Sequence, residues 1–184
     1  MRRFLIAISL VGALLVLTVP AALAASAHFK KGGEPVCTIS GGTTSKSTTC
    51  TATLSGLGGG NLDINTTVKG FAVYQCQNGG GNLSPGQNRV LEGPSTVPTF
   101  IDSAAIKNGN LTFHTNANTL SADATVSGSA AGCPNANWTG VNPVLTLTGI
   151  TLDIFQPVDT RIFHCTASNS GGLSSPVTLT CVSP

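Results

Sequence analysis

The chain has 184 residues, of which 41% are hydrophobic and only 9% are charged, whereas a globular domain typically carries roughly 25% charged residues. This length is typical of a single domain, and the low charge argues against a charged disordered tail. If residues 1–24 are removed, seven Lys and Arg remain against seven Asp and Glu, so no net charge is left to attract nucleic acid or an anionic membrane.

Residues 1–24 have the three parts of a secretory signal peptide. Arg2 and Arg3 form a basic start, residues 4–19 are almost entirely apolar, and a stretch of small residues ends at Ala24. This order predicts cleavage after Ala24, with a cut after Ala27 as the alternative. An uncleaved membrane anchor is disfavoured because the apolar run is shorter than the ~20 residues that a spanning helix needs. We therefore expect a protein that is secreted, extracellular or associated with the cell envelope, with no membrane span after cleavage.

The rest of the chain divides into a short arm and one domain. Residues 25–35 have little apolar content and include Lys30, Lys31 and two glycines, which predicts a flexible N-terminal arm. Residues 36–184 are rich in Thr, which favours strands, and in Gly and Asn, which favour turns. Good helix formers are scarce. This composition predicts a single all-β domain over residues 36–184.

Hydrophobic alternation predicts about ten strands. Two of them, residues 62–76 and 144–155, change phase at Gly70 and Gly149, which indicates a bulge in each or, at Gly70, a break between two strands. Asn108-Gly109 is a strong signal for a hairpin turn. The other predicted strands are residues 36–40, 48–55, 89–91, 97–101, 104–107, 111–115, 120–127, 161–166 and 177–182.

The number and spacing of these strands predict a Greek-key β-sandwich of immunoglobulin-like type, with a jelly roll as the alternative. Pro94 and Pro98 confine the strands that contain or flank them to the edges or ends of a sheet. Trp138 follows Cys133 by five residues in a turn-rich segment, so the buried Trp of true immunoglobulin domains is not clearly present. The prediction therefore concerns architecture and not family membership.

The cysteines predict a fold held by three disulfides. Their number is even, and they occur in a chain predicted to be exported. Zinc is disfavoured because no Cys-x-x-Cys or His-x-x-x-His pair is present. Cys37 and Cys165 each begin a Cys-Thr-x-Ser segment that continues through a glycine-rich loop to a second cysteine. We therefore expect the pairs Cys37–Cys50 and Cys165–Cys181, which leaves Cys76–Cys133 as the third.

Three motifs resemble those of known proteins. They are Cys-Thr-Ile-Ser-Gly-Gly at 37–42, Tyr-Gln-Cys-Gln-Asn at 74–78 with Pro-Gly-Gln-Asn at 85–88, and Cys-Pro-Asn-Ala-Asn-Trp-Thr at 133–139. Together they resemble a group of small, uncharacterised bacterial secreted proteins over most of the region from residue 36 to about residue 155. The resemblance implies secretion and a β fold, and it brings no activity and no site residues.

The chain has few groups that catalyse reactions. Its acids are separated in sequence, although folding could bring Asp63 and Asp153 together as the carboxylate pair of a glycosidase. His114 and His164 lie in predicted strands, and no Gly-x-Ser-x-Gly nucleophile motif is present. The glycine-rich segments lack the lysine of a phosphate-binding loop. We therefore predict no catalytic residue, no cofactor and no metal site, with a small secreted hydrolase as the alternative.

Binding or a structural role outside the cell is the favoured function, with a glycan or another cell-envelope component as the candidate partner. Sugar sites combine an aromatic platform with amide and hydroxyl groups, and Trp138 and Tyr74 are the only Trp and Tyr. The third disulfide would bring their two segments together. The residues predicted to form this cleft are Tyr74, Gln77, Asn78, Asn135, Asn137 and Trp138. The alternative is that Trp138 packs over the Cys76–Cys133 disulfide as part of the core.

Alternating threonines, as at Thr51 and Thr53 or Thr146 and Thr148, also stand out. This pattern is typical of the outward face of a strand. An ice-binding ladder of hydroxyls is the less favoured interpretation.

Overall fold

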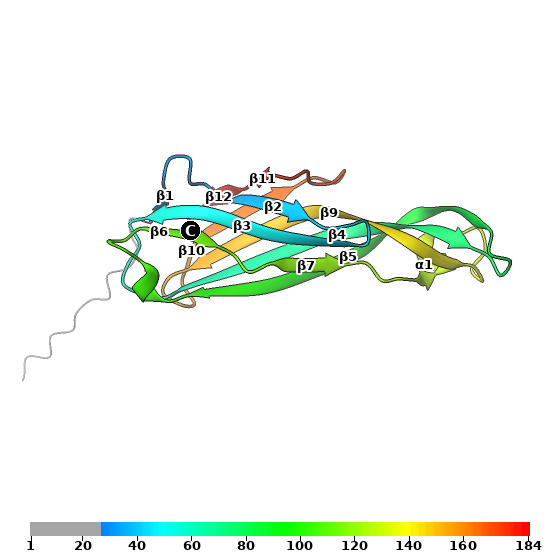
Figure 1. The fold of residues 1–184 in the computed structure, drawn as a ribbon, viewed down its shortest axis with the longest axis horizontal. Coiled ribbons are helices and arrows are strands. Elements are labelled where there is room, and N and C mark those ends of the chain that lie inside the picture. The colour runs from blue at the N-terminus through cyan, green and yellow to red at the C-terminus, as the bar shows by residue number, and fades with distance from the viewer. Residues whose placement is uncertain (1–26) are drawn as a thin grey trace, which may run out of the picture.

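The computed structural model describes residues 27–184, so the predicted signal peptide at 1–24 lies outside the described residues. These residues form an all-β fold of two six-stranded antiparallel sheets, which lie one over the other (Figure 1). The first sheet contains β1 (His28–Phe29), β2 (Val36–Ser40), β3 (Ser45–Ser55), β6 (Leu111–His114), β7 (Asn118–Ser121) and β11 (Val177–Thr178). The second sheet contains β4 (Leu62–Gln77), β5 (Leu83–Ile101), β8 (Val126–Ser127), β9 (Thr139–Phe155), β10 (Arg161–Ser168) and β12 (Thr180–Val182).

The first sheet is built around β3. This strand pairs with β2 along one edge and with β6 and β7 along the other, while β11 extends the sheet beyond β2. In the second sheet the order is β12-β10-β9-β4-β5. Its three longest strands, β4, β5 and β9, run past the end of the first sheet, where α1 (Gly128–Ala131) lies against them (Figure 1). A short 3-10 helix, η1 (Ser103–Ala105), follows β5. Residues 27–184 include no helix that is both long and apolar enough to cross a bilayer.

The core follows from the alternation within each strand. On β4, Leu62, Ile64, Thr66 and Val68 are fully buried, and the residues that alternate with them face outward. Equivalent rows from β3 and β9 meet them to form the main hydrophobic cluster between the sheets. A second, smaller cluster lies where the second sheet continues alone, and its buried members are Ala72, Tyr74, Cys76 and Ala131. The molecule therefore has a large core between the sheets and a small one near α1.

All three predicted disulfides are present. Cys37–Cys50 joins directly opposed residues of β2 and β3, and Cys165–Cys181 joins opposed residues of β10 and β12. Cys76–Cys133 fastens β4 to the segment that follows α1. Each sheet thus has its own cross-strand disulfide, and the third stabilises the end near α1.

The predicted irregularities at the two glycines are found, but β4 does not break at Gly70. Ala72, Tyr74 and Cys76 continue the buried face of β4 without a change of phase. The register shift at Gly70 arises because the partner strands β5 and β9 contain extra residues there. In β9 the extra residue is next to Gly149, as predicted. Phe71 is outward-facing and is buried because the guanidinium of Arg89 lies 4.3 Å from its ring centre.

Four further predictions of strand boundaries were wrong. Residues 104–107 overlap the helix η1 and form no strand, and residues 177–182 are divided between β11 and β12, which belong to different sheets. Residues 89–91 and 97–101 belong to one continuous strand, β5, which tolerates Pro94 and Pro98 because it lies at the edge of its sheet. Residues 120–127 are divided between β7 and β8, which pair with different sheets. The Asn108-Gly109 turn is correct, since both residues have positive φ and Lys107 pairs with Asn110 across them.

The described part of the predicted N-terminal arm is attached to the first sheet. His28 and Phe29 pair with β3, and the amide of Lys30 donates to the carbonyl oxygen of Thr53. The ring of Phe29 lies 4.5 Å from that of Phe163. Residues 28–33 therefore extend the first sheet, where the composition alone predicts a flexible segment.

Candidate functional site

One acidic side chain and one histidine, Asp153 and His164, meet on the outward face of the second sheet. Asp153 of β9 accepts hydrogen bonds from Arg161 at 3.3 Å and pairs with Nδ1 of His164 at 2.7 Å. Asp63 and Asp153 are on neighbouring strands, but the residue directly opposite Asp153 is Asn65. No hydroxyl or thiol of the described residues hydrogen-bonds to His164, so this cluster has no nucleophile next to its base.

A second acidic group faces the small core. The hydroxyl of Tyr74 donates to the carbonyl oxygen of Asp123 at 3.0 Å and lies 3.4 Å from the Glu92 carboxylate. Burial raises the pKa of Tyr74 to about 12, with a further contribution from the nearby Glu92. Burial, followed by repulsion from Asp123, also raises the pKa of Glu92 above its ordinary value. These contacts hold the tyrosine ring in place, and its hydroxyl has its partners within the protein.

The structure places Tyr74, Gln77 and the turn at Asn135 near Trp138, and it gives several of the residues of the predicted cleft structural contacts. Trp138 is half-buried and packs with Cys133 against the small core, which agrees with the alternative that it is a structural residue. Asn135 stabilises the local turn, because its side chain accepts from the amide of Asn137. Asn78 does the same at the tip between β4 and β5, where its side chain accepts from two backbone amides. Gln77 lies opposite Thr139, next to Trp138, as the third disulfide predicts.

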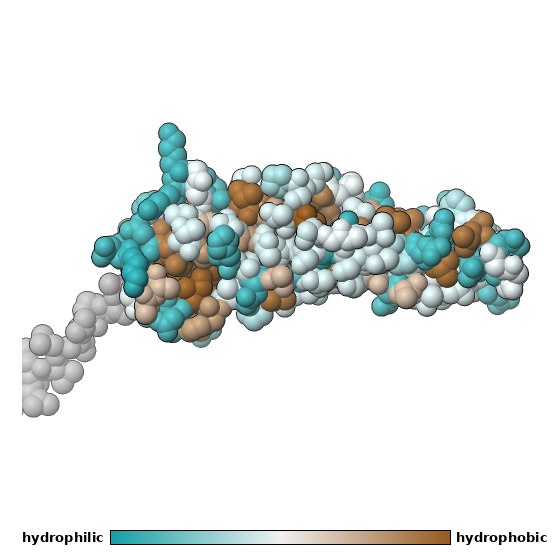
Figure 2. Space-filling model, in the orientation of Figure 1, coloured by the Kyte–Doolittle hydropathy of each residue, from teal (hydrophilic) through white to brown (hydrophobic). Residues whose placement is uncertain are grey.

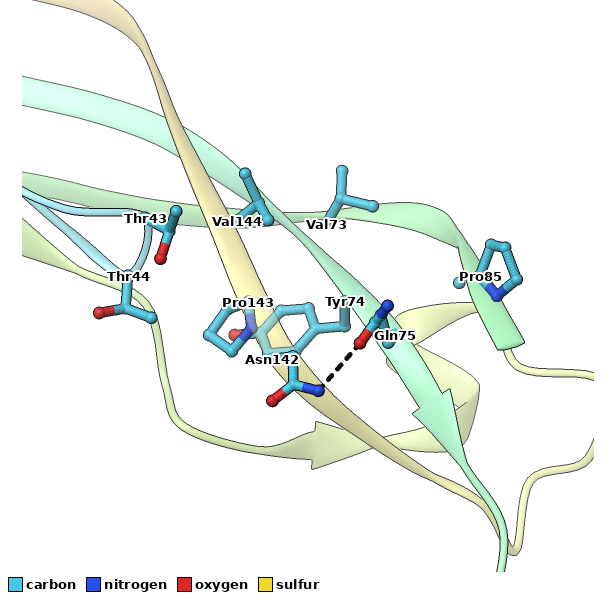
Figure 3. Close-up of a pocket in the computed structure, with 10 residues that line it drawn as sticks. Thr43, Thr44, Val73, Tyr74, Gln75, Pro85, Asn142, Pro143 and Val144 are labelled. Atoms are coloured by element: carbon cyan, nitrogen blue, oxygen red, sulfur yellow. Dashed lines mark hydrogen bonds between the residues drawn. The ribbon is translucent and has the colours of Figure 1, made fainter. Parts of the chain in front are cut away.

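A cavity of about 460 Å³ is lined in part by Tyr74. It lies where the second sheet loses its regular register. Between Val73 and Gln75, β9 has one more residue than β4, and β5 has two more. These bulges spread the strands on both sides of β4. We call this cavity the Tyr74 pocket, and its lining residues are Thr43, Thr44, Val73, Tyr74, Gln75, Pro85, Gly86, Asn142, Pro143 and Val144 (Figure 3).

The walls of the Tyr74 pocket are fixed by hydrogen bonds. The side chain of Asn142 donates to that of Gln75 at 2.9 Å, and Figure 3 shows the two amides pointing toward each other. Asn142 has a φ of 50°, a conformation that asparagine tolerates better than most residues. The loop before β3 is attached to the second sheet, since Thr43 accepts from the amide of Leu145 at 2.7 Å. The pocket is therefore formed before any ligand binds.

Sequence reasoning identified Tyr74 and grouped Asn142 with the asparagines near Trp138, but it missed the other residues of the pocket. They come from the loop before β3 and from three strands, and the bulges that align them depend on pairing between distant segments. Two local signals were present, namely Asn142-Pro143 directly before a predicted strand and Pro85-Gly86 within a glycine-rich segment. Both dipeptides are typical of irregular backbone. Neither indicates which segment lies beside it.

Comparisons of the chain with family models, with curated proteins and with solved structures found no match.

Proposed function

We propose that the protein is a secreted, non-catalytic binding protein and that the Tyr74 pocket holds a neutral sugar. The observation that carries this proposal is the chemistry of the pocket, because none of its lining residues is charged. Its volume of about 460 Å³ falls within the range of roughly 300–1,000 Å³ of small-molecule sites. A neutral sugar matches such a site better than an anion or a cation, since neither would find a counter-charge there.

The two kinds of surface that a sugar presents both have partners in the pocket. Sugar hydroxyls need donors and acceptors, which the amides of Gln75 and Asn142 and the hydroxyls of Thr43 and Thr44 supply. The C–H faces of a sugar ring need apolar contacts, which the lining valines and prolines supply. The existing hydrogen bond between Asn142 and Gln75 orients both amides, so little entropy is lost when the ligand binds.

The cellular location and the finer fold assignment are part of the same proposal. Secretion is supported by the signal-peptide pattern and by three disulfides, which persist in oxidising compartments. Membership in the group of bacterial secreted proteins is supported only by the motifs. For the sandwich, an immunoglobulin-like Greek key is supported by the adjacency of β4 and β9, which four intervening strands separate in sequence. A jelly roll is the alternative.

A glycan array with the mature protein tests the function, followed by titration of the best soluble oligosaccharide. Asn142→Gly removes the amide while tolerating the positive φ, and Gln75→Ala removes its partner. We expect each to weaken binding about tenfold, as loss of one or two ligand hydrogen bonds predicts. Gln87→Ala, at an exposed position outside the pocket, should leave affinity unchanged. The proposal is wrong if no neutral glycan binds, or if the pocket variants bind as well as the native protein.

The hydrolase alternative is supported by one observation, the 2.7 Å contact between Asp153 and His164. The missing nucleophile makes it the weaker function. Release of reducing ends from the bound oligosaccharide, abolished by His164→Ala, would favour it over simple binding.

A further inference from the structure

The outward face of the first sheet consists almost entirely of hydroxyl side chains. Buried and outward residues alternate along β3, so that Cys50, Ala52 and Leu54 point to the core and every second residue points to solvent. The same alternation holds in β2, β6 and β7. We call this surface the hydroxyl face. Its residues are Val36, Thr38, Ser40, Ser45, Ser47, Thr49, Thr51, Thr53, Ser55, Thr112, His114, Thr119, Ser121 and Thr178.

Over β2, β3, β6, β7 and β11 the hydroxyl face carries no Asp, Glu, Lys or Arg, and Val36 is its only aliphatic residue. At one end of the sheet, His28 of β1 lies opposite Ser55, and the exposed Lys30 follows β1. By contrast, the outward face of the second sheet includes Asp63, Lys69, Arg89 and Asp153. In Figure 2 a broad pale area lies over β2, β3 and β7, the colour of residues with intermediate hydropathy. Protein-binding surfaces are typically enriched in aromatic residues, Met and Arg, all of which are absent from this face. The composition fits a partner that is uncharged and rich in hydroxyls.

Hydrogen bonds between neighbouring strands hold many of these hydroxyls in fixed orientations. Thr53 and Thr112 are 2.9 Å apart, and Thr51 lies 2.8 Å from Nδ1 of His114. Farther along β3, Ser47 and Ser45 accept from Thr119 and Ser121. A hydroxyl has one donor and two acceptor positions, so each paired group keeps capacity for a further partner. The pairs therefore present oriented hydrogen-bonding groups to the solvent.

On the other edge of β3, one pair of hydroxyls forms no hydrogen bond to a side chain of the neighbouring strand. Thr38 and Thr49 are directly opposite each other on β2 and β3, and both are exposed. Neither side chain forms a hydrogen bond within the described residues. The centre of the hydroxyl face thus offers free donors and acceptors between rows that are already oriented.

We propose that the hydroxyl face binds the flat surface of an insoluble neutral polysaccharide. Hydroxyls on one strand repeat about every 6.7 Å and those on neighbouring strands about every 4.8 Å, which gives a regular two-dimensional array. An ordered polysaccharide surface presents its own hydroxyls in a regular repeat, so many weak hydrogen bonds form together. This inference rests on the proposed sugar-binding function and adds a second site. The Tyr74 pocket holds one chain, and the hydroxyl face holds the polymer surface.

Retention of the mature protein on crystalline cellulose and on chitin powder tests the proposal. Thr38→Val with Thr49→Val removes two free hydroxyls and keeps the side-chain shape. We expect the partition coefficient of the protein between powder and solution to fall about tenfold. The matched control is Thr166→Val with Thr180→Val, because these threonines are also exposed and directly opposed on two strands, but lie on the second sheet. The control should bind like the native protein.

The outcomes separate the two sites. Asn142→Gly should lose soluble oligosaccharide binding and keep retention on the polymer, whereas the Thr38 and Thr49 double variant should do the reverse. Equal retention of the double variant and the native protein would overturn the inference, as would equal losses in the double variant and its control. Failure of the native protein to bind either powder would also overturn it, even if soluble sugars bind. Ice shaping by native protein that neither powder retains would reassign the face to ice.

Discussion

Glu92 shows how a single partly buried carboxyl affects stability. Burial and the nearby Asp123 raise its pKa above the ordinary value of 4.5, so the folded protein binds this proton more tightly than the unfolded chain. Its contribution to stability is therefore complete below pH 4.5 and is lost as pH rises through the raised pKa. Glu92→Gln keeps an acceptor for Tyr74 and removes the charge. We expect this variant to melt higher than the native protein at pH 7 and no higher at pH 4. A lower melting temperature at pH 7 would contradict the assignment.

Trp138 is the residue for which the sequence leaves two roles open, a sugar platform or part of the core. Its packing against the small core predicts that Trp138→Ala costs about 3 kcal/mol of unfolding free energy, as for other large-to-small substitutions. Urea unfolding measures this loss, and Trp138→Phe should lose less. Sugar affinity should be unchanged in the folded fraction, because Trp138 does not line the Tyr74 pocket. Stable, cooperative folding of Trp138→Ala together with lost sugar binding would favour the cleft predicted from the sequence.

At the scale of elements, Gly70 marks the point where β4 lies beside the bulges of its two partner strands, β5 and β9. A Cβ atom at this position would overlap the carbonyl oxygen of Thr146 in β9. Gly70→Ala must therefore displace backbone, and we expect a loss of about 2–3 kcal/mol. Gly59→Ala is the control, because a Cβ there meets nothing within 4 Å. Denaturant unfolding of both variants measures the difference, and equal stability would show that the bulge adapts without cost.

The elements also explain which parts of the fold could be predicted. Alternation identified β4 and β9, and the repeated cysteine motif identified the disulfides, because both signals are local in sequence. β5 was divided into two predicted strands because Gly93, Pro94 and Pro98 interrupt its pattern, although an edge strand tolerates them. The Tyr74 pocket was missed because it depends on bulges in β5 and β9 that coincide only after pairing. Similarly, the hydroxyl face becomes visible only when β6 and β7 are placed beside β3.

At the scale of the whole molecule, covalent links contribute more to stability than charges do. Each sheet and the end near α1 has its own disulfide, and four of the six cysteines are fully buried. The Cys76–Cys133 link spans 57 residues, a loop that the entropy model values at about 4 kcal/mol. The two ion pairs of the described residues share Asp153 and are partly exposed. Exposed pairs contribute ~0–1 kcal/mol each.

We therefore expect the melting temperature to be nearly constant between about 0.05 and 0.5 M salt, a range over which exposed ion pairs become screened. Reduction should lower it sharply, because loss of one native disulfide typically costs ~2–5 kcal/mol. Thermal unfolding of the mature protein across this salt range, with and without reductant, measures both effects. Alkylation after the reduced scan verifies that all three disulfides have opened. A melting temperature that moves strongly with salt and hardly with reductant would mean that electrostatic interactions, and not the disulfides, stabilise the two sheets.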